Sequence, residues 1–280
     1  MASSIAPRIS GREWGGSVKL LFSEAAPDYG HYLYPYVVWG FLEPGETPAN
    51  AFEAGFLPGS PAMDRFYLVR QLRVPLREWE STSENRRLLR KADAFDCELI
   101  PRAQFQDTPE RRAAWLAYAA EKFGPGVMPP ERLDRLMNGP IISHLLHFTD
   151  RKTGADVGTA LMFLQSPRVA WYYYAFYRLT PETRYVGMAM MTRAVEFFTH
   201  EGFHHLHLGT CYSERALYKT QFEPMEFFNG MRWSRNLDEL KHLVRTTPEG
   251  RHRLEEPEFL AFQSGTPASI AEASPFRSAR

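Results

Sequence analysis

The chain has 280 residues, 44% of them hydrophobic and 24% charged, a composition typical of a globular protein with a sizeable buried core. Its 33 basic residues balance its 33 acidic residues, which excludes the strong overall positive charge of most electrostatic nucleic-acid binders. Two cysteines exclude a disulfide framework, and the lack of a signal-peptide core or of ~20 consecutive apolar residues predicts a cytoplasmic protein with no membrane partner.

The first half of the chain is expected to alternate strands and capped helices. Residues 1–60 are rich in proline, glycine and aromatic residues and form a segment that should pack on the core. The run 31–41 is expected to be the ordered piece of this segment, and apolar or alternating runs predict strands at 65–76 and 95–101. Helical spacing predicts helices at 81–92, 107–123 and 131–138. Ser81 or Ser83 is expected to cap the first helix, and Asp107 or Thr108 the second.

The second half begins with an antiparallel meander. A hairpin is expected over 144–165, followed by a strand at 169–176 that is rich in β-branched and aromatic residues. An amphipathic helix follows, and the remaining elements are a strand at 205–212, a short helix at 214–222 and helices near 237–244 and 255–262. We therefore divide the chain into an N-terminal segment (1–60), a core domain (61–245) and a C-terminal tail (246–280) that is partly disordered.

The turn between the 169–176 strand and the next helix carries the pattern R-x-x-G-x-A, formed by Arg184, Gly187 and Ala189. Backbone N–H groups at a helix N-terminus bind anions, and small residues let a ligand approach the backbone closely. We therefore assign this turn, with Tyr185 and Met188, to the phosphate of a donor substrate. The alternative is a purely structural strand-to-helix turn, but the strand before it and the helix after it favour the motif.

The succession of strand, turn, helix and strand over 169–222 resembles the acetyltransferase-like (GNAT) superfamily, whose turn has the pattern Q/R-x-x-G-x-G/A. The resemblance implies an α/β (α+β) fold with a mixed, largely antiparallel sheet flanked by helices. It also implies the transfer of an acyl group to an amine.

Further matches to the motifs of one family extend over about two-thirds of the chain, from about Gly55 to Trp233. They are Ser83, Arg86, Arg87, Phe176, Tyr177, Arg184, Gly187, Leu208, Gly209, Tyr218, Lys219, Phe222, Pro224, Glu226 and Trp233. Together they resemble the aminoacyl-tRNA–protein transferases of the arginyl/leucyl-transferase family. The resemblance implies charged tRNA as co-substrate, no bound cofactor, and the N-terminal amine of a protein or peptide as acceptor.

The chain departs from this family at two places. The family's N-terminal cysteine cluster is absent from the region before Leu72, and His205 and His207 share a strand face without a further ligand at suitable spacing, so no metal site is expected. Arg178 stands where the family has an aspartate, which reverses the charge. If the family's aspartate holds a cationic aminoacyl group, this chain is suited to a neutral or acidic group instead.

Tyr218 and Lys219 are the candidate catalytic residues. Tyr218 stands where acetyltransferase-like enzymes have a tyrosine that protonates the leaving group, and a phenol with a pKa near ~10 is suited to that step. Lys219 beside it is suited to stabilise an oxyanion or a phosphate. The alternatives are a tyrosine that packs on the sheet and a surface lysine.

The other candidate site residues are assigned to the two substrates. A basic helix face with Ser83, Arg86 and Arg87 is assigned to the donor's phosphates, although a solvated face that pairs with acidic neighbours, and a capping role for the serine, are the alternatives. The acyl or acceptor pocket is assigned to residues that stack or carry charge, although core packing is the alternative for most of the aromatic ones. These residues are Tyr174, Phe176, Tyr177, Arg178 and Glu226.

Two other functions remain open at this point. In an acyl-CoA-dependent N-acetyltransferase, the same turn would hold the pyrophosphate of acetyl-CoA. A catalytically inactive adaptor would bind tRNA or protein N-termini without turnover. The acyl group, the acceptor and the oligomeric state do not follow from the sequence.

Overall fold

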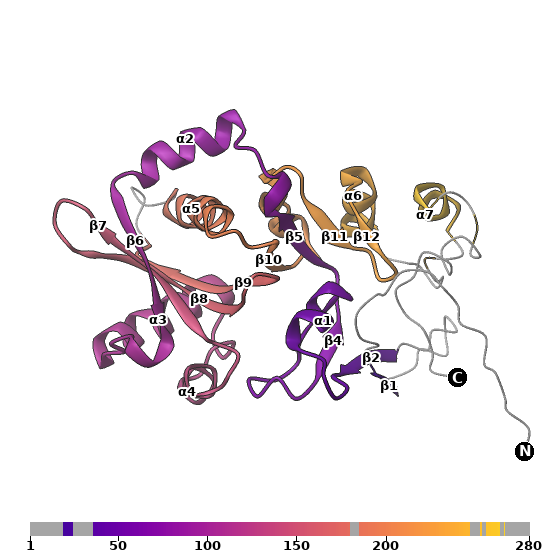
Figure 1. Ribbon diagram of the computed structural model, residues 1–280, viewed down its shortest axis with the longest axis horizontal. Helices are drawn as coiled ribbons and strands as arrows, with labels where there is room; N and C mark the ends of the chain where they lie inside the picture. Colours follow the sequence, from indigo (N-terminus) through magenta and orange to yellow (C-terminus); the bar gives the residue numbers. More distant parts are fainter. Residues whose placement is uncertain are drawn as a thin grey trace, which may run out of the picture.

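The computed structural model describes residues 19–24, 36–179, 185–246, 253, 256–263 and 266. Its main element is an eight-stranded sheet with the strand order β12-β11-β5-β10-β9-β8-β7-β6 (Figure 1). Neighbouring strands are antiparallel except for β9 and β10, which are parallel. The expected mixed, largely antiparallel α/β fold is therefore confirmed. The strands are β5 (Gln71–Pro75), β6 (Phe95–Pro101), β7 (His144–Asp150), β8 (Asp156–Gln165), β9 (Val169–Tyr177), β10 (His205–Thr210), β11 (Glu226–Phe228) and β12 (Trp233–Ser234).

Helices cover both faces of this sheet, and each face has its own apolar core. Helices α2 (Ser83–Ala92) and α5 (Val186–His200) lie on one face, where Met190 and Val195 of α5 pack against residues such as Leu206 of β10 (Figure 1). The other face is covered by α1 (Pro48–Glu53), α3 (Pro109–Phe123) and α4 (Pro130–Asn138), where Phe52 and Trp115 are buried. The chain continues with α6 (Leu237–Arg245) and α7 (Pro257–Phe262).

A second, four-stranded sheet packs beside α1 with the order β1-β2-β4-β3. Its strands are β1 (Lys19–Glu24), β2 (Tyr36–Phe41), β3 (Phe56–Pro58) and β4 (Phe66–Leu68). The division expected at residue 60 stays a prediction, and the small sheet takes strands from both sides of it. Most of the tail from residue 246 lies outside the described residues. Within the described residues, no helix is long and apolar enough to cross a membrane.

The single strand expected at 65–76 is wrong, because the chain bends and joins two sheets. Residues 66–68 form β4 in the small sheet, whereas 71–75 form β5 in the large one. At the bend, the Gln71 amide donates to the Val69 carbonyl at 3.0 Å, which turns the chain within three residues. Apolar and polar residues keep alternating through the bend, so the sequence pattern does not indicate it.

The N-cap of α2 also differs from the expectation of Ser81 or Ser83. Thr82 is the cap: its hydroxyl accepts from the Asn85 amide at 3.2 Å, and the Asn85 side-chain oxygen accepts from the Thr82 amide at 3.1 Å. This reciprocal pair needs an acceptor side chain three residues after the cap, and counting from Ser83 gives Arg86, which can only donate. The cap of α3 is Thr108, one of the two expected residues.

The parallel strands β9 and β10 pair only over Val169–Trp171 and His205–His207, and then diverge. Both strands are irregular where they separate. In β9, the pairing with β8 passes from Tyr172 to Tyr174 and leaves Tyr173 as the extra residue of a bulge. In β10, the register with β5 shifts between His207 and Gly209, and Gly209 has a φ of +78°, which favours glycine. The bulges open the sheet at its centre.

Candidate functional site

A cavity of about 790 Å³ occupies the opening between β9 and β10, and we call it the slot. On one face of the sheet it is lined by α5 and by the 3₁₀ helix η4 (Glu214–Gln221); on the other it is lined by α3, α4 and the small sheet. The slot therefore passes through the sheet, and its volume lies in the range of small-ligand sites. Its lining includes Tyr67, Tyr118, Lys122, Phe123, Arg132, Tyr174, Tyr177, Gly187, Met188, Arg215, Tyr218 and Lys219.

The start of α5 meets the slot at the turn that carries the R-x-x-G-x-A pattern. The helix has no side-chain N-cap and no acidic residue in its first turn, so its N–H groups and dipole remain suited to an anion. Gly187 and Met188 line the slot, whereas Ala189 is fully buried in the core. Tyr185 ends the turn as the N-cap residue of α5, and the Lys91 ammonium lies 4.5 Å from its ring centroid. Arg184 lies outside the described residues.

Gly187 has a packing reason to be glycine. A Cβ at this position would lie 2.6 Å from the Tyr177 Oη atom and 2.7 Å from Cζ of the same ring. The Tyr177 ring therefore lies directly against the helix start. This contact explains the glycine without a ligand and brings a predicted pocket residue next to a predicted donor-binding residue.

Both candidate catalytic residues line the slot from η4. Tyr218 is 49% exposed, and the burial of part of its phenol raises its pKa above the usual value, which keeps the proton on the oxygen. The Lys219 ammonium donates to the Thr210 carbonyl at 3.0 Å, and burial lowers its pKa. The slot thus combines a protonated phenol with a cation held at the end of β10.

The aromatic residues of β9 divide between the slot and the core. Tyr174 and Tyr177 line the slot, and the Tyr174 hydroxyl accepts from the Arg132 guanidinium at 3.2 Å. Phe176 is 1% exposed and stacks on Trp115 with ring centroids 5.1 Å apart. Phe176 therefore packs in the core beneath the slot.

Three predicted donor-binding residues lie away from the slot, near the start of α2. Arg87 pairs with Glu84 at 2.6 Å, and Ser83 occupies the first turn of the helix. Arg86 donates to the Ser81 carbonyl and lines a different hollow of about 730 Å³. The C-terminal end of α2 instead reaches the start of α5, because Lys91 contacts the Tyr185 ring.

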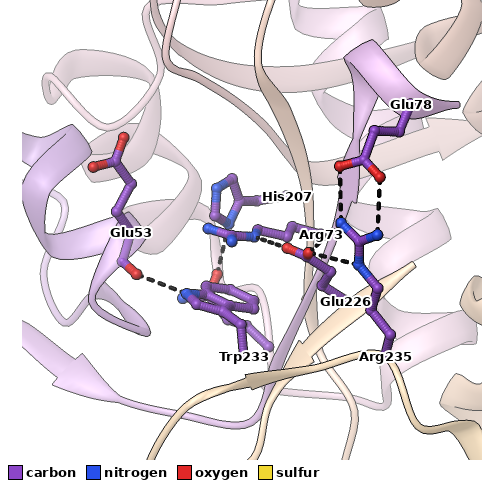
Figure 2. Close-up of polar contacts among 8 residues, drawn as sticks. Glu53, Arg73, Glu78, His207, Glu226, Trp233 and Arg235 are labelled. Carbon is purple, nitrogen blue, oxygen red and sulfur yellow. Dashed lines mark hydrogen bonds and ion pairs between the residues drawn. The ribbon is translucent and has the colours of Figure 1, made fainter. Parts of the chain in front are cut away.

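Arg178 and Glu226 also lie outside the slot. Arg178 lines an adjacent hollow of about 610 Å³ along α3, which shares Tyr118 and Tyr177 with the slot. Glu226 is largely buried on the α1 face of the sheet and pairs with Arg73 at 2.7 Å (Figure 2). Burial alone would raise the pKa of Glu226, but Arg73 and Arg235 outweigh it and the pKa lies below its usual value.

The buried pair belongs to a network that ties the end of the sheet together. The Arg73 guanidinium lies 3.7 Å from the centroid of a Trp233 ring, and the Trp233 indole N–H donates to the Glu53 carbonyl at 2.7 Å (Figure 2). Arg235 joins Glu226 to Glu78 by further ion pairs. Glu226 therefore connects β11 with β5, and its place in the fold is structural. In the described part of the chain, no three histidine, cysteine or carboxylate side chains converge as a metal site would require.

The slot lining is basic, which sequence reasoning did not foresee. Lys122, Arg132, Arg215 and Lys219 line it, and none of the described lining residues is Asp, Glu or His. Many other arginines are neutralised by carboxylates, such as Arg168 by Glu53. Arg215 was within reach of a sequence argument because it lies one turn before Tyr218; nothing in the sequence brings Lys122 or Arg132 to this site.

Comparisons with known proteins point to transferases. No family model matches the chain. The aspartate/glutamate leucyltransferase of Chromohalobacter salexigens is 24% identical over 216 residues, which cover 70% of this chain and 85% of that protein. This match supports an acyltransferase at the coarse level.

Two solved structures are also similar. The C-terminal domain of a putative lysylphosphatidylglycerol synthetase from Agrobacterium fabrum has a TM-score of 0.38 and 16% identity, over 62% of this chain and 54% of that one. A glucosamine N-acetyltransferase region of a fungal multi-domain β-N-acetylglucosaminidase has a TM-score of 0.38 and 9% identity, over 57% of this chain and 20% of that one. The chain thus spans about half of the first structure and a fifth of the second.

Proposed function

We propose that this protein transfers an aminoacyl group from charged tRNA to the N-terminal amine of a protein or peptide. The observation that carries the proposal is the slot through the sheet, with the helix start of α5 and Tyr218 on one face and aromatic and basic residues of α3 and α4 on the other. The 24% identity to an aspartate/glutamate leucyltransferase supports it independently, because that enzyme's name describes the transfer of an aminoacyl group.

In the proposed reaction, the neutral acceptor amine attacks the ester carbonyl of the aminoacyl donor. A C–N bond forms, and the C–O bond to the ribose oxygen breaks. Tyr218 gives its proton to that departing oxygen, and the proton lost by the amine nitrogen restores the phenol through solvent. Proximity supplies much of the acceleration, because an aminoacyl ester is already activated.

The oxyanion that forms on the carbonyl needs nearby donors. The bulge at Tyr173 takes one residue of β9 out of regular pairing with β8, at the wall of the slot. We assign the oxyanion to a backbone N–H of β9 after Trp171, where β10 no longer pairs with it, and to the Lys219 ammonium across the slot. The donor's phosphates are assigned to the start of α5 and to the basic lining of the slot.

A second candidate function is the acyl-CoA-dependent N-acetyltransferase. The uncapped start of α5 favours it, because the same N–H groups suit a pyrophosphate as well as a phosphodiester. In that reaction a thiolate leaves in place of the ribose oxygen, and Tyr218 has the same role.

The test is to incubate the purified protein with a peptide library and either a pool of charged tRNAs or acetyl-CoA, and to measure by mass spectrometry which group is added. An aminoacyl mass on the N-terminal amine, abolished by ribonuclease treatment of the donor, supports the proposal. An acetyl mass supports the second candidate. Binding of tRNA without any added mass identifies an inactive adaptor and contradicts both.

A further inference from the structure

We propose that the mouth of the slot is a stacking platform for single-stranded RNA. It would hold the nucleotides that precede the acylated terminal adenosine of the donor. The inference rests on the proposed function, because it specifies how that site holds its nucleic-acid substrate, but it is tested by binding alone.

Four aromatic side chains form an arc along the slot, and they come from three different elements. In α3, the Phe123 and Tyr118 rings are in edge contact with centroids 5.9 Å apart, and Tyr118 is 5.0 Å from Tyr177 of β9. Tyr218 of η4 completes the arc, because it lines the same cavity as Tyr118 and Tyr177. All four residues line the slot. We call this set the aromatic arc.

The two ends of the arc are exposed. Phe123 is 41% exposed and Tyr218 is 49% exposed, although large exposed apolar side chains are few in the described part of the chain. Val127, which is 38% exposed, follows Phe123 closely in the chain, and its carbonyl accepts from the slot residue Arg132 at 2.8 Å. Exposed apolar groups that gather at the edge of a cavity mark a binding surface.

Each exposed end of the arc has a cation beside it. Lys122 precedes Phe123, and Arg215 lies three residues before Tyr218; both line the slot. Within the described residues, neither has a carboxylate at ion-pair distance, whereas Arg193 pairs with both Asp93 and Glu196. The mouth thus has exposed aromatic faces next to uncompensated positive charges.

This combination fits single-stranded RNA better than duplex RNA or CoA. Every base has a face that stacks on an aromatic ring, and successive bases are joined by phosphates that a lysine or arginine binds. Base pairing hides these faces in a duplex. CoA carries a single adenine, whereas the arc has two exposed rings that come from separate elements. The arc is therefore suited to a ligand with more than one base.

The test uses a 5′-fluorescein-labelled RNA hexamer that ends in CCA with a free 3′ hydroxyl, and measures its affinity by fluorescence anisotropy. Phe123→Ala should weaken binding by roughly tenfold or more, and Phe123→Leu should weaken it similarly, because leucine keeps the apolar contact but cannot stack. Lys122→Gln and Arg215→Gln should each reduce the slope of log affinity against log salt by about 0.7. Melting curves establish that each variant is folded.

Lys152→Gln is the matched control, since this exposed lysine lies in the turn between β7 and β8, away from the slot, and its substitution should change nothing. Equal affinity for the hexamer in a duplex, failure of the wild type to bind the hexamer, or displacement by CoA that depends on Phe123 would each overturn the platform.

The outcomes also separate this inference from the proposed function. Hexamer binding that needs Phe123, without aminoacyl transfer, supports the platform and contradicts the proposed function. Transfer from intact tRNA, with hexamer affinity unchanged in both Phe123 variants, contradicts the platform alone.

Discussion

At the scale of single residues, the proposed transfer depends on the phenol of Tyr218. Its raised pKa keeps it protonated through the physiological range, as a proton donor to the leaving group requires. Tyr218→Phe keeps the ring but removes the proton, and should lower kcat by about 100-fold, the scale of one general acid. Wild-type kcat should not fall between about pH 7 and 9 through loss of this proton. Steady-state rates across pH check both expectations, and a kcat of Tyr218→Phe within twofold of wild type would remove Tyr218 from the reaction.

Gly187 is the second residue where local geometry gives a sharp expectation. A Cβ at this position collides with the Tyr177 ring, so Gly187→Ala should cost about 1–3 kcal/mol of unfolding free energy through overpacking. In the double variant Gly187→Ala/Tyr177→Ala the colliding ring is gone. The double variant should therefore lose less unfolding free energy than the sum of the losses in the two single variants. Urea unfolding of the two single variants and the double variant measures the coupling. Additive losses would show that the glycine does not pack on this ring.

At the scale of elements, β10 places two histidines beside the Arg73–Glu226 pair. Burial, and then the Arg73 guanidinium, lower the pKa of His205 to about 3, and burial lowers that of His207 well below its usual value. Between pH 3 and 6.5 the unfolded chain therefore binds more protons than the folded chain, so stability falls as the pH drops below 6.5. A loss of roughly 4–5 kcal/mol by pH 3 is expected from His205 alone.

Urea titrations at several pH values check this expectation. The unfolding free energy should rise with pH up to about 6.5 and then stop responding to these histidines. His205→Gln should flatten the acid part of the profile, because glutamine does not titrate. An unchanged pH profile in this variant would show that the pKa of His205 is the same in the folded and unfolded chains.

Local sequence patterns predicted where the helices and strands lie better than they predicted which of them pair or pack together. The strand, turn, helix and strand from Val169 onwards were predictable because their periodicity and turn residues are local signals. The break between β4 and β5 was not predictable, because apolar and polar residues alternate in the same way in both strands, which differ only in the sheet that they join. Glu226 was assigned to a pocket, but it packs against Arg73, which is 153 residues away and adjoins it only through the pairing of β5 with β11.

The site divides in the same way. Tyr218, Lys219 and Gly187, which line the slot, were named as candidates from the sequence because they belong to local motifs at the helix start and in η4. Lys122 and Arg132 were not, because the helices that hold them reach the slot only when α3 and α4 cover the far face of the sheet (Figure 1). The bulges that open the slot depend on registers with β8 and β5, which no single segment encodes.

At the scale of the whole molecule, balanced overall charge hides a basic slot. Like charges in a partly desolvated cavity repel by about a kcal/mol or more, so a cationic aminoacyl group should be disfavoured by roughly tenfold against a neutral one. Arg132→Gln should reduce the preference for a neutral over a cationic aminoacyl group. Arg178→Gln is the matched control and should leave it unchanged, because Arg178 lines the adjacent hollow. A competition assay with arginyl- and leucyl-tRNA gives the ratio, and a wild-type preference for arginyl-tRNA would contradict the charge argument.

If aminoacyl transfer takes place in the slot, a side chain that obstructs the slot should abolish the transfer. Ala175 lines the slot from β9, so Ala175→Trp should obstruct the slot between the diverging strands, whereas Ala155→Trp adds the same side chain in an exposed turn. The measurement is the initial rate of aminoacyl transfer from charged tRNA to a peptide N-terminus, with circular dichroism to establish folding. The account predicts a loss of at least about 100-fold for Ala175→Trp and a wild-type rate for Ala155→Trp. A wild-type rate in folded Ala175→Trp would place the reaction elsewhere and contradict the account.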